Sequence, residues 1–149
     1  KGIGDKLSSE IFAELNEEDS KLFVTCSGSN EVRIFDTSNG EIISSFSLNK
    51  QPWHLALSND NENLFTTNRG GMSVSKINFK TETVFDLSDS SMQMPHGCVL
   101  TPDESELIIS ASGGNRIFVV DTKSMKIIDM INFETPMSMP TGIAIFEEN

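Results

Sequence analysis

The sequence predicts an all-β chain built from tandem repeats of about 43 residues. Three prolines that open equivalent segments lie 43 and 45 residues apart: Pro52, Pro95 and Pro140. Three apolar runs recur 42 and 43 residues apart, at Leu22, Leu64 and Leu107. Independent markers with one period indicate a repeat array, and a period of roughly 40–50 residues is typical of propeller blades. The predicted fold is therefore a β-propeller segment, with three four-stranded blades and the first strand of a fourth.

Each repeat is expected to contain four short strands, and the third repeat shows them most clearly. Its expected strands cover residues 97–100, 106–111, 116–121 and 126–132. Short β-branched runs separated by turn residues about every ten positions favour an all-β fold over βαβ units. The turn between the two middle strands holds Gly113 and Gly114, and glycine is expected to supply the positive φ of a tight hairpin there.

The domain organisation follows from the repeat. The blades are expected at residues 10–51, 52–94 and 95–139, and residues 140–149 would form the first strand of the next blade. A closed propeller has about 4–8 blades, so three blades leave two open faces. Either self-association or the remainder of a longer propeller would cover them, and the longer propeller is the favoured interpretation.

The composition argues against a nucleic-acid partner, a membrane span and a disulfide bond. The formal net charge is −11, with 22 acidic and 11 basic residues, and no basic stripe is present, so no nucleic-acid partner is expected. No apolar run reaches the roughly 18 residues of a membrane span. Cys26 and Cys98 occupy different strands of different repeats, so no disulfide between them is expected.

Two stretches of the chain, residues 52–68 and residues 101–122, resemble the YVTN-type β-propeller repeat. The relatives of this family include lactonases and cytochrome d1-like propellers. Phe23, Phe65 and Ile108 occupy the slot that is tyrosine in this family, because the chain has no tyrosine. The resemblance implies a propeller fold and an extracytoplasmic location, periplasmic or secreted. It implies no single reaction, because the family is functionally mixed.

One face of the predicted propeller collects the candidate ligand-binding residues. By analogy with propellers, the first strand of each blade lines the central channel. The segments that enter the first strands and the turns between the second and third strands then lie on the same face. The candidates on this face are Trp53, His54, Arg69, His96, Arg116 and Thr141. The arginines could meet an anionic ligand. The alternative is that the histidines pack against a neighbouring blade and the arginines pair with surface acids.

Methionines form a second candidate site. The segments 92–96 and 137–140 repeat the pattern Met-x-Met-Pro, and the first also holds a histidine. Thioethers with an imidazole suit Cu(I), so Met94, His96 and Met139 are candidate metal ligands. The alternative is that methionine fills irregular gaps between twisted blades. No cofactor is predicted, and copper is the alternative.

These features predict a non-enzymatic binding or scaffold module that presents loops around a central channel to a protein or a small ligand. The alternative is an enzyme or a redox propeller, either lactonase-like or associated with copper or haem. The chain has no Gly-x-Ser-x-Gly motif for a nucleophilic serine and no Cys-x-x-Cys-His motif for haem attachment. We therefore predict no catalytic residue.

Overall fold

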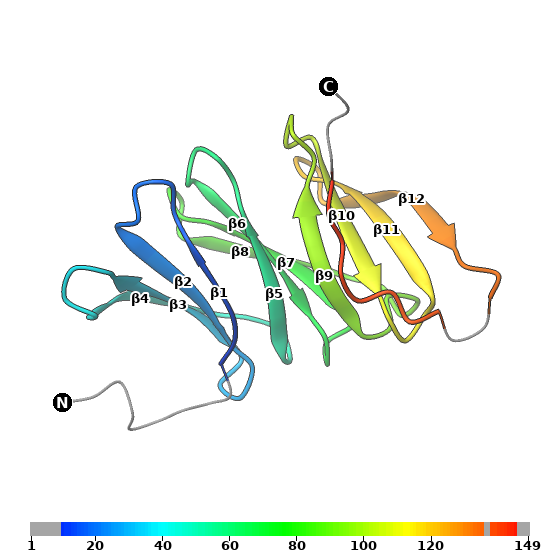
Figure 1. The fold of residues 1–149 in the computed structure, drawn as a ribbon, viewed down its shortest axis with the longest axis horizontal. Coiled ribbons are helices and arrows are strands. Elements are labelled where there is room, and N and C mark those ends of the chain that lie inside the picture. Colours follow the sequence, from blue (N-terminus) through cyan, green and yellow to red (C-terminus); the bar gives the residue numbers. More distant parts are fainter. Residues whose placement is uncertain (1–9, 136–137, 146–149) are drawn as a thin grey trace.

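The computed structural model describes residues 10–135 and 138–145, which form three four-stranded antiparallel sheets. Each sheet contains one repeat, and its strands pair in sequence order. The sheets stand side by side along the chain (Figure 1). The predicted all-β architecture of three four-stranded blades is confirmed. No helix in the described part of the chain is long and apolar enough to cross a membrane.

The strand bounds lie close to those expected from the repeat. The first sheet contains β1 (Glu10–Leu15), β2 (Lys21–Cys26), β3 (Glu31–Asp36) and β4 (Ile42–Ser47). The second contains β5 (Pro52–Leu57), β6 (Asn63–Asn68), β7 (Ser73–Asn78) and β8 (Thr83–Ser88). The third contains β9 (Pro95–Leu100), β10 (Glu106–Ala111), β11 (Arg116–Asp121) and β12 (Lys126–Asn132). The first strands of neighbouring sheets contact each other, β1 with β5 and β5 with β9.

Residues 138–145 continue this inner row without forming a regular strand. The segment runs beside β9 in Figure 1. Ser110 Oγ donates to the carbonyl oxygen of Thr141 at 3.0 Å. That oxygen would lie 2.7 Å from a Cβ added at Gly97, so only glycine allows the two segments to approach this closely. Residues 146–149 of the predicted next strand lie outside the described residues.

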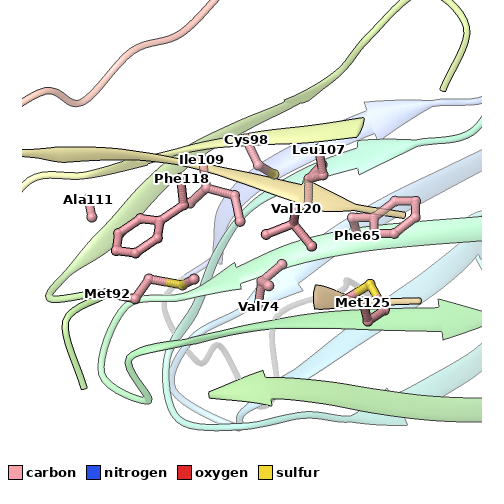
Figure 2. Close-up of a cluster of buried hydrophobic side chains, with 10 residues drawn as sticks. All are labelled: Phe65, Val74, Met92, Cys98, Leu107, Ile109, Ala111, Phe118, Val120 and Met125. Carbon is pink, nitrogen blue, oxygen red and sulfur yellow. The ribbon is translucent and has the colours of Figure 1, made fainter. Parts of the chain in front are cut away.

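Two apolar clusters hold the three sheets together. The cluster between the first and second sheets contains Phe23, Val32, Ile34, Leu55, Leu64 and Ile77. The cluster between the second and third sheets is drawn in Figure 2, where Met92 lies beside Phe118. Met92 is 0% exposed, so this methionine fills the gap between blades, as one sequence interpretation predicted.

The predicted role of the hairpin glycines is wrong. Asn30, Met72 and Asn115 have the positive φ in the turns between second and third strands, at 58°, 48° and 51°. The glycines of the second and third of these turns make room for the linker that enters the first strand of the same sheet. A Cβ at Gly71 would lie 2.9 Å from Asn49 Cγ, and one at Gly114 would lie 3.0 Å from the Ser91 carbonyl oxygen. Close approach of an inter-blade linker, rather than backbone conformation, requires these glycines.

One buried hydroxyl in each sheet links the inner strands of neighbouring blades. The hydroxyls belong to Thr25, Thr67 and Ser110, and all three side chains are 0% exposed. Each lies where the pairing of the first two strands shifts register. Each accepts a backbone N–H from its own sheet, at 2.9–3.1 Å. Each also donates to a carbonyl of the next inner segment: Trp53, His96 and Thr141, at 2.9, 2.7 and 3.0 Å.

We expect Thr67→Val to lower the free energy of unfolding by about 1–3 kcal/mol. Valine preserves the shape of the side chain but leaves the His54 N–H and the His96 carbonyl without this partner. Thr66→Val is the matched control, because Thr66 is equally buried and its hydroxyl makes one long contact, 3.4 Å, to the Thr67 carbonyl. Denaturant unfolding measures both variants, and equal losses of stability would contradict the proposed role of the hydroxyl.

Candidate functional site

Backbone hydrogen bonds bring the predicted ligand face together. The Arg69 N–H donates to the Gln51 carbonyl at 2.8 Å, which joins the turn after β6 to the segment that leads into β5. In the third sheet, the Ser112 N–H donates to the Met94 carbonyl at 3.1 Å in the same way. The turns between second and third strands therefore share a face with the starts of the first strands in both sheets.

Trp53, Arg69 and His96 meet on this face, and we call them the Trp–Arg–His cluster. The Arg69 guanidinium carbon lies 4.7 Å from the centroid of the Trp53 ring, in cation–π geometry. The Trp53 indole Nε1–H donates to His96 Nε2 at 3.1 Å. The other imidazole nitrogen, Nδ1, lies 3.1 Å from the Thr141 carbonyl oxygen. These two partners together select the neutral imidazole that carries its proton on Nδ1.

The charge state of His96 agrees with this arrangement. Burial lowers the pKa of His96 from its ordinary value of 6.5. The hydrogen bond with the Thr141 carbonyl acts in the opposite direction and raises this pKa, while the positive charge of Arg69 lowers it further. A neutral imidazole has one lone pair available to a metal, and here Trp53 uses it. Copper would have to displace the indole hydrogen bond.

The methionines predicted to join His96 at a copper site have other surroundings. Met94 is 37% exposed, and its sulfur lies against the Gly113 turn. Met139 is 50% exposed, and its backbone N–H donates to Asn115 Oδ1 at 2.9 Å. In the described ranges, no three His, Cys, Asp or Glu side chains gather in a possible metal site. Among the hydrogen bonds and ring contacts of the described residues, none links these two thioethers to His96.

His54 lies apart from the cluster although it follows Trp53 in the chain. Its ring stacks on Phe12 of β1, with centroids 3.9 Å apart and an interplanar angle of 35°. Its Nδ1 lies 3.7 Å from Cys98 Sγ. Burial lowers the pKa of His54, and the nearby His96 adds to this effect. Burial also raises the pKa of the Cys98 thiol, so both groups are held neutral.

The remaining two predicted residues contribute less to the cluster. Arg116 begins β11 and lies near the linker that precedes β9. Hydrogen bonds from Ser91 lower the pKa of Asp89 in that linker, and the charge of Arg116 adds to this effect. Thr141 joins the cluster through its backbone carbonyl. The structure therefore brings together three of the six predicted side chains and one carbonyl group.

A groove of about 500 Å³ runs along the inner strands. Its walls come mainly from β1, β5 and β9, and Ile143 also lines it. The Phe12–His54 stack lies in it, together with two carboxylates, Glu14 and Glu104. Burial raises the pKa of Glu14, and this effect outweighs a hydrogen bond from the Leu57 backbone that lowers the same pKa. No lysine or arginine is among the described residues that line the groove.

Sequence analysis missed Phe12 and Glu14 as parts of this groove. The repeat contained the necessary signal, because β1 is equivalent to β5 and β9, and alternate residues of a first strand share one face. The first repeat, however, lacks the proline that marked the other two first strands.

We expect the fluorescence of Trp53, the one tryptophan of the chain, to titrate with a midpoint below pH 6.5. Protonation of His96 at Nε2 removes the acceptor of the indole N–H. Below pH 6.5 an unfolded chain binds a proton here before the folded chain does, so stability falls as pH falls toward the lowered pKa. His96→Gln should abolish the titration and His54→Gln should preserve it. A midpoint at or above 6.5 would contradict the arrangement.

The chain matches no protein-family model, and no curated protein matches it in sequence. Many solved structures match its fold. Hydrazine synthase from Kuenenia stuttgartiensis matches with a TM-score of 0.79 and 20% identity, over 90% of this chain and 38% of that chain. Virginiamycin B lyase from Staphylococcus aureus, in a catalytically inactive form with quinupristin, matches with a TM-score of 0.78 and 20% identity, and the match covers 93% of this chain and 46% of that chain. The RRP9 WD40 repeats match with a TM-score of 0.74 and 12% identity, and the match covers 87% of this chain and 40% of that chain.

The chain spans less than half the length of each of these structures. They include both enzymes and WD40 repeats, and at 20% identity or below they show the fold alone. The chain is a segment of a β-propeller.

Proposed function

We propose that the chain is a binding module of a YVTN-type β-propeller, and that it binds a small molecule in the groove along β1, β5 and β9. The groove itself is the observation that carries this proposal. A concave site with apolar and aromatic walls and a few polar groups is the usual form of a small-molecule site. Three blades contribute to it, as expected for a ligand near the axis of a propeller.

The chemistry of the groove favours a ligand with an apolar body and a cationic or hydrogen-bond-donating end. The Phe12–His54 pair offers an aromatic surface, and Ile143 offers an aliphatic one. Glu14 is half-buried at one wall. Glu104 accepts the Asn59 backbone N–H at 2.6 Å, which keeps its carboxylate at the groove. Two carboxylates without a lining cation complement a positively charged ligand.

The state of the candidate catalytic groups supports binding over acid–base or nucleophilic catalysis. Both nitrogens of His96 have partners, and His54 packs between an aromatic ring and a neutral thiol. A nucleophilic cysteine needs a lowered pKa, whereas burial raises that of Cys98. A lactonase-like or redox activity would therefore depend on groups other than these.

Further blades would complete the ring. The outer strand β12 of the third sheet exposes large apolar residues, among them Ile128 and Ile131, at 54% and 52%. Exposed apolar patches of this kind mark surfaces that other protein covers. A protein partner, a second copy of the chain and the other blades of a longer propeller all fit this surface, and we favour the longer propeller. The extracytoplasmic location implied by the YVTN resemblance belongs to the same proposal.

Light scattering on a sizing column tests the proposed ring. The chain mass is 16.4 kDa, and we expect larger species, because the open sheet faces would associate. A uniform dimer would identify a second copy as the source of the missing blades, and a broad distribution would support a longer propeller. A uniform monomer would contradict the proposal that other blades cover these faces.

We expect Val99→Phe to block the groove. Val99 lines it from β9 and belongs to neither buried cluster, so the added ring would occupy the ligand space. The matched control is Val84→Phe, on outer strand β8, where the side chain is 38% exposed. Ligand-detected NMR with a library of aromatic amines measures binding. Amines that bind the original chain and the control but not Val99→Phe would support the site, and equal binding to all three would refute it.

A further inference from the structure

Among the described residues, Arg69 is a cation that forms no ion pair. Its Nε atom is buried and has no hydrogen-bond partner. No described acidic side chain forms an ion pair with it, although acidic residues outnumber basic ones by 22 to 11. Two other cations have partners: Arg33 pairs with Glu31 at 2.5 Å, and Lys76 Nζ donates to the Thr122 carbonyl at 2.8 Å.

The surroundings of Arg69 hold its side chain in place without neutralising it. The guanidinium stacks on Trp53, and Trp53 is itself held by its hydrogen bond to His96. The backbone of Arg69 is tied to Gln51. Because the His96 imidazole is neutral, the Arg69 guanidinium is the charged group of the cluster. A fixed, planar, permanently charged group with free donors is the usual means of binding a carboxylate.

A second cation borders the same turn. A Cβ added at Gly70 would lie 3.2 Å from Lys50 Cγ, so the aliphatic part of Lys50 lies against the turn that contains Gly70. The Lys50 side chain belongs to an exposed residue. Glycine at position 70 is what allows this approach. Two positive residues, Arg69 and Lys50, therefore lie at this turn on a chain whose overall charge is strongly negative.

We propose that the Trp–Arg–His cluster is a recognition site for a carboxylate group of a ligand, with Arg69 as its ion-pairing residue and Trp53 as the platform that orients it. This site is separate from the groove, because none of the three cluster residues lines the groove. A ligand with a carboxylate would use the cluster, and one with an apolar, cationic body would use the groove.

Trp53 makes this site directly observable, because the ligand would bind beside the one tryptophan of the chain. Its fluorescence is followed during titration with sodium succinate, with sodium chloride held so that ionic strength stays constant. We expect a saturable change with succinate and none when chloride alone is varied. Arg69→Gln should weaken succinate binding by about tenfold to a hundredfold, the range for a charged hydrogen bond. Arg69→Lys should also weaken it, since lysine lacks the planar fork.

The matched control is Arg116→Gln, which removes the same charge outside the cluster and should leave the titration unchanged. Circular dichroism confirms that each variant retains its β structure. Equal loss of binding in the Arg69 and Arg116 variants would overturn the proposal, because it would indicate general charge attraction. Tighter binding of inorganic phosphate than of succinate would overturn the assignment to a carboxylate. Val99→Phe should leave the succinate titration intact, so failure of the groove proposal and failure of this one are distinguishable.

Discussion

The buried hydroxyl that bridges neighbouring inner strands is the interaction on which the arrangement of the three sheets depends. Each sheet would be complete by its own hydrogen bonds, and apolar packing between sheets sets no particular register. The hydroxyl of Thr25, Thr67 or Ser110 adds direction, because it accepts from one inner strand and donates to the next. Its repetition at equivalent positions gives the four inner segments, β1, β5, β9 and residues 138–145, the same offset from one to the next.

The hydroxyl bridges also position the residues of the two candidate sites. The Thr67 bridge occupies the irregular pairing between β5 and β6, beside Trp53 and His54. The carbonyl of Trp53 and the N–H of His54 are both used by bridging hydroxyls, from Thr25 and Thr67. The Trp53 ring then meets His96 and Arg69, whereas the His54 ring meets Phe12 and Cys98. Two adjacent residues thereby serve two different surfaces, and the irregularity that holds the blades together also divides the sites.

The two surfaces differ in charge as well as in shape. The groove carries carboxylates and neutral imidazole, and the Trp–Arg–His cluster carries a guanidinium without a described acidic partner. An amphiphilic ligand, or two separate ligands, would be sorted by this difference. It also explains why the net charge of −11 says little about the ligand, since recognition depends on local groups that the overall sum conceals.

The repeat, the four strands of each blade and the face on which Trp53, Arg69 and His96 gather could all be predicted from the sequence alone. These follow from local turn chemistry and from a period that equivalent residues share. The membership of the cluster needed the tertiary structure: Arg69, directly after β6, lies over the Trp53 ring, whereas Arg116 begins β11 and lies near Asp89. The same holds for the close approach that the hairpin glycines serve, and for the groove that Phe12 and Glu14 line. Those outcomes depend on contacts between blades, and the spacing of residues along one chain does not encode which side chains meet across them.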